Sequence, residues 1–317
     1  MRLPIKLNKA GWPSAMARLS FAFDDPRPLA YEACTLSPHR FSSAVSTLQF
    51  GATFKTTFPG RQGYSNQLLL RLYRDSKPVI LDVGASDGST SRDLIQVLEG
   101  NFARYFVTDL NISARCGCDR RGAVYFQDAN GVCVLRASQR LLAYSNVSGA
   151  PHPLRFIARR MIAGSRHVGE WRNILLIQPE LLKMAERDTR ITAIRYDMFT
   201  AWTGQPPNLI KVANLLNSKY FSDDQMKAAL RVQCSQLAPN GRLLLVSEDD
   251  NIEKFSLFRK TSVRMLLEHT HAGGAKAARH VPVDGIVTPT PVESVLSAQP
   301  LLYEVTKGRV ANRSQDE

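Results

Sequence analysis

The sequence lacks any long apolar run. No stretch of about 18 apolar residues occurs among its 317 residues, so we expect no membrane-spanning helix. The first 23 residues contain Arg2, Lys6, Lys9 and Arg18, but neither an acid nor the apolar stretch of a secretory signal. We therefore expect a basic N-terminal arm on a cytoplasmic protein, and we leave open whether that arm is a targeting segment.

Cysteines are few and scattered. The five thiols are an odd number, and the spacing Cys116-Gly117-Cys118 does not match a zinc knuckle. No Cys/His pair follows it at the usual interval. We expect reduced thiols and no metal.

Acidic residues are fewer than basic residues. The chain has 28 Asp and Glu against 41 Lys and Arg, which gives a net charge of +13. No acid occurs between Ala129 and Gly169, where six arginines stand: Arg136, Arg140, Arg155, Arg159, Arg160 and Arg166. Such a segment could contact nucleic acid, an acidic protein or an anionic membrane, or simply face solvent. No sequence-specific nucleic-acid motif is present, so the contact we consider is peripheral, with an acidic surface, through Arg155, Arg159, Arg160 and Arg166.

Seven apolar segments read as strands, and most are separated by helical patterns. They cover residues 79–83, 104–110, 190–199, 208–214, 242–248, 253–260 and 262–270, the last two as a closing antiparallel pair. This alternation predicts an α/β fold with a doubly wound, seven-stranded, mostly parallel sheet. Ligands of such sheets bind at the carboxyl ends of the strands.

The segment after the second strand is too long for an ordinary connection. We predict an insertion over about 112–180, with a hairpin turning at Asn130-Gly131 and a basic amphipathic helix over 150–169 near the mouth of the ligand pocket. The predicted units are an N-terminal basic and aromatic extension (1–62), a catalytic domain (63–271) and a flexible tail (272–317). The phenylalanines of the extension suggest a segment that packs on the main domain and covers a pocket. In the tail we expect one short helix near Pro291 to Ser297.

The segment VILDVGASDGST (79–90) has two interpretations. Gly84-x-Ser86-x-Gly88 fits the strained turn that carries the nucleophilic serine of α/β-hydrolases. The same turn, with Asp82 two residues before it, resembles the glycine turn with which many methyltransferases hold S-adenosylmethionine (SAM). The hydrolase alternative lacks an upstream loop of the HGGG kind, although histidines follow downstream. A nicotinamide enzyme would need glycines in place of Ser86 and Ser89.

Acids stand at the ends of three predicted strands. Asp82 could orient a methionine amino group or the amides of the turn. Asp109 lies 21 residues after Gly88, which is the usual interval to the acid that holds a ribose diol. Asp197 could accept a hydrogen bond from an adenine amino group. Together with the turn, these acids favour a nucleoside-containing cofactor.

Residues 65 to 270 resemble class I SAM-dependent methyltransferases. Three stretches are similar to the chemotaxis-receptor glutamate methyltransferases: the turn Gly84-x-Ser86-x-Gly88, the segment from Asn214-Leu215-Leu216 to Tyr220-Phe221, and LAPNGRLLL (237–245). The resemblance implies a SAM-methyltransferase-like Rossmann fold, SAM as the cofactor, and a pocket lined by Asn214 and Leu215. The expected cofactor contacts are Asp82, Gly84, Ala85, Ser86, Gly88, Asp109, Leu110, Asp197, Met198, Asn214 and Leu215.

The expected activity is methyl transfer from SAM to an unidentified acceptor, as an O-methylation of a small molecule or of a protein carboxylate or hydroxyl. The sulfonium leaving group is already good, so the protein mainly aligns the acceptor, and no catalytic residue can be named. Neither the [DN]PP[FY] motif of adenine methylation nor a Pro-Cys pair for cytosine is present. The alternative is a catalytically silent methyltransferase-like module that binds an acidic partner or membrane. A serine hydrolase using Ser86 is less favoured.

Replacing Ser86 by Ala distinguishes the cofactor turn from the nucleophile. We expect SAM affinity to stay within about tenfold of the wild-type value, the scale of one neutral hydrogen bond, about 1.4 kcal/mol. A titration of both proteins with SAM measures this. Covalent labelling of Ser86 by a fluorophosphonate probe would instead establish the hydrolase.

Overall fold

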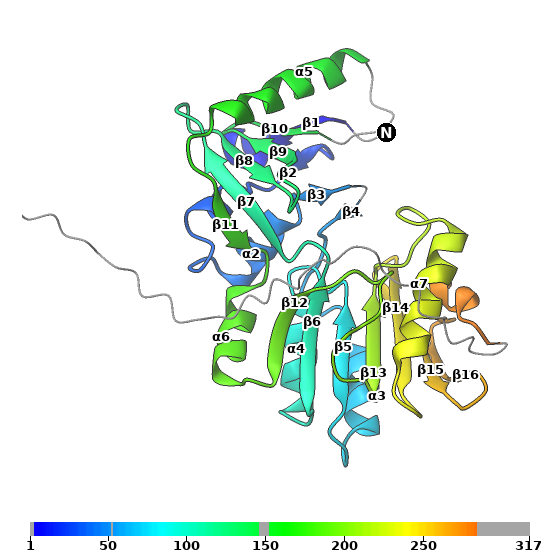
Figure 1. Ribbon diagram of the computed structural model, residues 1–317. Helices are drawn as coiled ribbons and strands as arrows, with labels where there is room; N and C mark the ends of the chain where they lie inside the picture. Colours follow the sequence, from blue (N-terminus) through cyan, green and yellow to red (C-terminus); the bar gives the residue numbers. More distant parts are fainter. Residues whose placement is uncertain (1–2, 52, 146–151, 284–317) are drawn as a thin grey trace, which may run out of the picture.

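The computed structural model describes residues 3–51, 53–145 and 152–283, and two seven-stranded sheets lie one above the other in Figure 1. The lower one, here the main sheet, has the order β12-β6-β5-β13-β14-β15-β16. Its strands are β5 (Val79–Val83), β6 (Arg104–Asp109), β12 (Ile191–Arg195), β13 (Leu209–Ala213), β14 (Arg242–Asp249), β15 (Ile252–Lys260) and β16 (Met265–His271). The predicted α/β class and the seven strands are confirmed.

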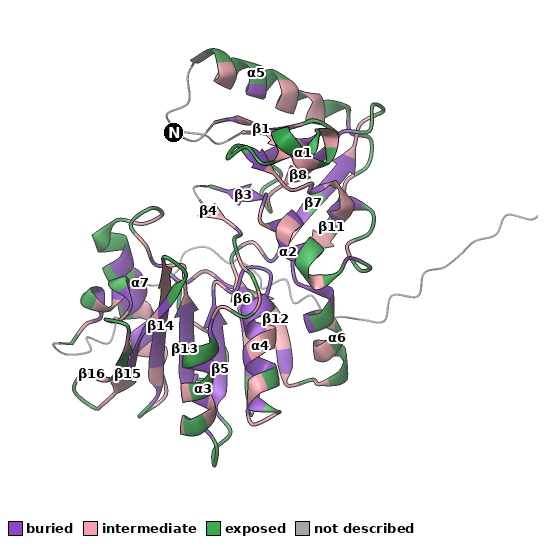
Figure 2. Ribbon diagram, turned by 180° about the vertical axis from the view of Figure 1, so that it is seen from behind, coloured by how far each residue is buried: buried purple, intermediate pink, exposed green. Residues whose placement is uncertain are grey.

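Helices cover both faces of the main sheet. They are α3 (Gly63–Leu72), α4 (Ser89–Leu98), α6 (Pro179–Arg187), α7 (Asp223–Gln236) and the 3₁₀ helix η4 (Lys276–His280). Side chains of α3, α4 and α6 pack with Ile80 and Tyr105 on one face, and those of α7 pack with Leu81 and Ile210 on the other. The central strands are therefore buried apolar runs, as Figure 2 shows, and this double covering explains their nearly continuous hydrophobicity.

The sheet is mixed. The four pairings among β12, β6, β5, β13 and β14 are parallel, whereas β14, β15 and β16 pair antiparallel in sequence order. The predicted closing antiparallel pair is confirmed. None of the helices in the described ranges has the length and apolar character needed to cross a bilayer.

The second sheet has the order β11-β7-β8-β9-β10-β1-β2 and joins two distant parts of the sequence. Its strands are β1 (Ile5–Asn8), β2 (Ala22–Phe23), β7 (Ser113–Cys118), β8 (Val124–Gln127), β9 (Cys133–Ala137), β10 (Leu141–Tyr144) and β11 (Arg172–Leu175). β1 pairs antiparallel with β10, so the first residues continue the sheet built by residues 113–144. The two segments also share one apolar core, which includes Phe41, Leu48, Phe126 and Leu135.

Short elements of the N-terminal segment complete this upper layer. They are the 3₁₀ helices η1 (Lys9–Gly11) and η2 (Arg27–Ala30), the helices α1 (Ser14–Ala17) and α2 (Pro38–Val45), and the hairpin β3 (Gln49–Phe50) and β4 (Thr53–Phe54). In Figure 1 the hairpin lies between the two sheets. It thereby brings residues 49–62 to the carboxyl ends of the main-sheet strands.

The predicted hairpin at Asn130-Gly131 is confirmed by the antiparallel pairing of β8 with β9. The basic helix forms as α5 (His152–Ala163), followed by η3 (Gly164–His167). Its predicted position near the pocket mouth is wrong, because α5 packs on β9 and β10, on the side of the second sheet away from the main sheet (Figure 1). The insertion does leave from the end of β6, but its strands carry the helix away. Residues 150–151 and the tail over 284–317, with the helix expected near Pro291 to Ser297, lie outside the described residues.

The main sheet contains a buried charge network at its centre. The Asp82 carboxylate lies 2.9 Å from the Lys211 ammonium, its partner in register on β13, and both side chains are almost fully buried. Ser91 and Tyr105 each donate a hydrogen bond to the same carboxylate at 2.8 Å. The network fixes α4 against the sheet, so the role of the Asp82 carboxylate is to stabilise the fold.

Removing one partner should leave the other charge buried without compensation. We expect Lys211→Met to lower the free energy of unfolding by about 3–5 kcal/mol, measured by urea denaturation. The double variant Asp82→Asn/Lys211→Met removes both charges and should recover most of that loss. Equal destabilisation of the single and double variants would contradict the pairing.

Candidate functional site

A cavity of about 380 Å³ opens at the carboxyl ends of β5, β6, β12 and β13. Ten of the eleven predicted contacts line it: Asp82, Gly84, Ala85, Ser86, Asp109, Leu110, Asp197, Met198, Asn214 and Leu215. These residues come from four separate strand ends, and the parallel sheet gathers them at one edge. No histidine is among the described residues that line the cavity, so Ser86 has no imidazole base there.

The glycine turn has two glycines with different surroundings. Gly84 has φ +70°, and a side chain there would place its Cβ 2.5 Å from Leu215 Cδ2 at the wall of the cavity. Gly88 has φ +77° and does not line the cavity. A Cβ at Gly88 would instead collide with Leu181 of α6. Gly84 therefore keeps the cavity open, whereas Gly88 allows the start of α4 to pack against α6.

Asp109 is held in place by groups from two distant segments. Its Oδ1 lies 2.9 Å from the Lys55 ammonium and accepts a hydrogen bond from the Asn111 amide at 2.8 Å. Its Oδ2 accepts one from the Ser86 amide at 2.9 Å. Lys55 also donates to the Ser86 carbonyl at 3.1 Å. The carboxylate is thus oriented and its charge compensated, and Oδ2 keeps one free acceptor position.

The other predicted polar contacts differ in how free their side chains are. Asp197 accepts one hydrogen bond, from the Phe199 amide at 3.0 Å, through Oδ1. Asn214, with φ +56°, uses its Oδ1 to accept from the Glu248 amide at 2.8 Å and so ties β13 to β14. Asp82 lines the cavity, but its carboxylate belongs to the buried network with Lys211.

Two buried polar atoms at the cavity have no hydrogen-bond partner within the described residues. They are Ser86 Oγ and Gln62 Oε1. Unsatisfied buried oxygens are costly, so such atoms mark positions where a bound group completes the hydrogen bonding. Ser86 lies at the centre of the turn and has a left-handed backbone conformation, with φ +60°.

The N-terminal segment supplies a wall of the cavity that the sequence did not reveal in detail. Its lining residues are Phe50, Thr53, Phe54, Lys55, Thr56, Thr57, Arg61 and Gln62. The phenylalanine-rich composition indicated a packed segment over a pocket. No local signal distinguishes Lys55 from the other surface-type lysines, because its burial depends on Asp109, 54 residues later.

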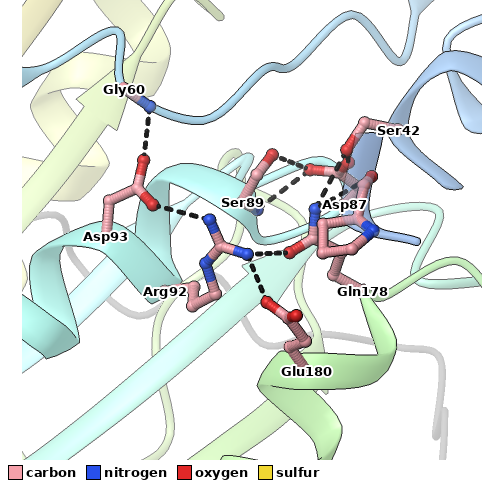
Figure 3. Close-up of polar contacts among 9 residues, drawn as sticks. Ser42, Gly60, Asp87, Ser89, Arg92, Asp93, Gln178 and Glu180 are labelled. Carbon is pink, nitrogen blue, oxygen red and sulfur yellow. Dashed lines mark hydrogen bonds and ion pairs between the residues drawn. The ribbon is translucent and has the colours of Figure 1, made fainter. Parts of the chain in front are cut away.

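The Asp87 carboxylate connects this turn to both neighbouring layers (Figure 3). Ser42 of α2 donates to Asp87 Oδ2 at 2.5 Å, and Ser89 donates to Oδ1 from both its amide and its hydroxyl. Gln178, at the start of α6, donates to Ser42 Oγ at 3.1 Å and accepts from Arg92 at 3.1 Å. Arg92 in turn contacts Asp93 and Glu180. The turn is therefore fixed by α2, α4 and α6 together.

Elsewhere the described residues contain no cluster of three or more His, Cys, Asp or Glu side chains arranged to hold a metal. The five cysteines are free thiols. The cavity is therefore best described as a polar and aromatic small-molecule site.

No protein-family model and no curated protein matches the chain. Among solved structures, it is similar to the N-methyltransferase NodS from Bradyrhizobium japonicum WM9 in complex with S-adenosyl-L-homocysteine, at 17% identity and a TM-score of 0.31 over 61% of this chain. It is also similar to SAM-bound CalS10, an amino pentose methyltransferase from Micromonospora echinaspora, at 13% identity and a TM-score of 0.28 over 64% of this chain. A third is an O-methyltransferase family protein from Burkholderia thailandensis, at 10% identity and a TM-score of 0.31 over 71% of this chain.

The chain spans 64% of NodS and of CalS10 and 45% of the Burkholderia protein. Similarity at this level does not establish a family. The function is therefore inferred from the residues of the cavity.

Burial raises the pKa of the Asp87 carboxyl above its ordinary value, although Ser42 and Ser89 hydrogen-bond to it. A carboxyl with a raised folded-state pKa stabilises the fold below its unfolded pKa of about 3.9, and this contribution is lost as pH rises through the folded-state pKa. The free energy of unfolding of Asp87→Asn, relative to wild type, should therefore increase from about pH 4 upward. Urea unfolding at several pH values measures it, with the exposed Asp75→Asn as control. A pH-independent difference would count against a raised pKa.

Proposed function

We propose that this chain is a SAM-dependent methyltransferase whose cofactor binds in the cavity at the carboxyl edge of the main sheet. The observation that carries the proposal is the convergence of Asp109 and two unsatisfied oxygens, Ser86 Oγ and Gln62 Oε1, on one cavity beside the glycine turn. Each group comes from a different segment, and none of the three is explained by packing alone.

The residues present fit this cofactor. The cavity volume of about 380 Å³ lies in the range of small-molecule sites, about 300–1,000 Å³. Asp109 Oδ2 can accept from a ribose hydroxyl. Asp197 Oδ2 accepts no hydrogen bond from the described residues, so it can accept from an exocyclic amino group. Gly84 leaves the wall open beside Leu215. When bound, the cofactor supplies an electrophilic methyl group.

The protein's own residues would then bind, orient and exclude water. Phe50 and Phe54 of the hairpin cover the cavity from one side, and Phe199, Tyr220 and Phe221 line it from another. This enclosure limits solvent at the reacting atoms, and correct alignment of the acceptor is the largest requirement of methyl transfer.

The acceptor atom we propose is an oxygen, of a carboxylate or a hydroxyl, on a small molecule or a protein. A carboxylate is already ionised at neutral pH and needs no general base. That suits a cavity in which two of the three lining acids are ion-paired, Asp82 with Lys211 and Asp109 with Lys55, and the third, Asp197, is proposed to hold the cofactor. Tyr220 is placed to orient such an acceptor.

The second candidate is a catalytically silent module with this fold. The Lys55–Asp109 ion pair favours it, because the ammonium occupies one oxygen of the acid expected to hold the ribose. Such a module would bind its partner through the basic second layer, with or without bound SAM; the form that this ion pair favours is the one that does not bind the cofactor. The two candidates therefore differ in a single measurable property.

Isothermal titration with SAM and with S-adenosylhomocysteine distinguishes them. The methyltransferase should bind both at micromolar concentration.

Asp109→Ala should weaken SAM binding about 10- to 100-fold, because a partly buried charged acceptor is lost. Gly84→Val should abolish binding through its contact with Leu215 while the far-UV spectrum stays that of the folded protein. Absence of binding to the wild-type chain would favour the silent module.

Asp109→Ala also leaves the Lys55 charge buried alone, so a control must separate folding from binding. The double variant Lys55→Met/Asp109→Ala removes that unpaired charge and should regain stability. Its SAM affinity should remain as low as that of the single variant. If affinity returned together with stability, Asp109 would be a structural residue and the ribose contact would lie elsewhere.

A further inference from the structure

A second concave site lies on the second layer, between α5 and the β8–β9 side of the sheet. This hollow has a volume of about 850 Å³. Its main lining side chains are Arg120, Arg121, Arg136, Arg160, Tyr125 and Phe156. No residue of the hollow lines the cavity described above. The hollow is therefore a separate feature, and its occupant must be inferred from its own chemistry.

The hollow has an excess of positive charge that the described residues do not neutralise. Arg120, Arg121 and Arg160 form no ion pair with any described carboxylate, and Arg136 donates to the Tyr125 hydroxyl at 3.1 Å. The only lining acid is Asp119, which accepts from two amides of its own turn and from Tyr125. Four guanidinium groups thus surround the hollow against one carboxylate that is already engaged.

An exposed aromatic side chain accompanies these arginines. Phe156 is 62% exposed and its neighbour Ile157 is 47% exposed, although α5 buries Ala158 on its other side. η3 packs closely against Tyr125 only because residue 164 is a glycine, since a Cβ there would collide with the Tyr125 hydroxyl. Guanidinium groups beside an exposed aromatic ring are the elements that hold phosphates and stacked bases.

We propose that this hollow binds a single-stranded nucleic acid without sequence preference. Arg120, Arg121 and Arg160 would contact successive phosphates, and Phe156 would stack on a base. The net charge of +13 supports a polyanionic partner. An anionic membrane fits less well, since the site is concave and α5 presents few exposed apolar side chains for insertion. This binding goes beyond the proposed methyl transfer and does not depend on it.

The structure also sharpens which arginines take part. Of Arg155, Arg159, Arg160 and Arg166, only Arg160 lines the hollow. The other arginines of the hollow, Arg120, Arg121 and Arg136, lie on the strands and turn of β7 to β9. The arginines that share this site are therefore those that the fold brings together, and not those that follow helical spacing in the sequence.

Fluorescence anisotropy with a fluorescein-labelled 12-nucleotide oligouridylate tests the proposal on the full chain. The variant Arg120→Gln/Arg121→Gln/Arg160→Gln should bind about 100-fold more weakly than wild type at about 0.1 M salt. Its slope of log affinity against log salt should be smaller by about 2, as expected for three lost phosphate contacts on a single strand. Phe156→Ala should weaken binding by about fivefold or more.

The matched control removes the same charge from the other layer. Arg74, Arg187 and Arg264 are exposed, and none forms an ion pair within the described residues; their replacement by Gln should leave affinity within about threefold, since remote exposed charges are screened. Equal losses in the two triple variants would overturn the site in favour of general charge attraction. Unchanged binding by the hollow variant would also overturn it. So would salt-sensitive binding to phosphatidylserine vesicles through the same arginines with no binding to the oligonucleotide.

Discussion

The carboxylate of Asp87 is the point at which the two layers of this protein meet. It accepts hydrogen bonds from Ser42 of α2, in the upper layer, and from Ser89 at the start of α4, in the main layer. Because Asp87 is part of the glycine turn, the same contacts fix the turn whose backbone forms the cavity wall. The upper layer therefore completes the site, since it also supplies Lys55.

This dependence explains why the sequence predicts one half of the site and misses the other. Asp109, Asp197 and the turn follow directly from strand ends, because parallel strands bring their carboxyl ends to one edge. Lys55 reaches the cavity through the second layer, which depends on the pairing of residues 5–7 with residues 141–143 and on the packing of α2. Gln62 lies at the start of α3. The strand pairing joins residues more than 130 positions apart, and no local periodicity encodes it.

The wrong position predicted for α5 has the same cause, because local patterns do not show nonlocal contacts. The rule that ligands bind at strand ends gives the point from which the insertion leaves the main sheet, after β6. It does not give the path of the inserted chain, which forms four strands before α5 begins. The turn residues Asn130-Gly131 identified the hairpin, whose two strands are local. The sheet that carries α5 away also includes the nonlocal strand β1, and a sequence pattern does not show such a partner.

The arginines of the hollow differ from four arginines of the main layer in whether a carboxylate pairs with them. In the main layer, Arg92, Arg190, Arg242 and Arg259 are ion-paired, so their charge is compensated by the fold. Around the hollow the charge stays uncompensated. α5 lies on the side of the second sheet away from the main sheet, and the hollow shares no lining residue with the cavity (Figure 1). A single-stranded nucleic acid held in the hollow must therefore pass around the second layer to reach the cavity. If both proposals hold, the hollow sets where a polymer is held, and the groups at the carboxyl edge of the main sheet carry out the methyl transfer.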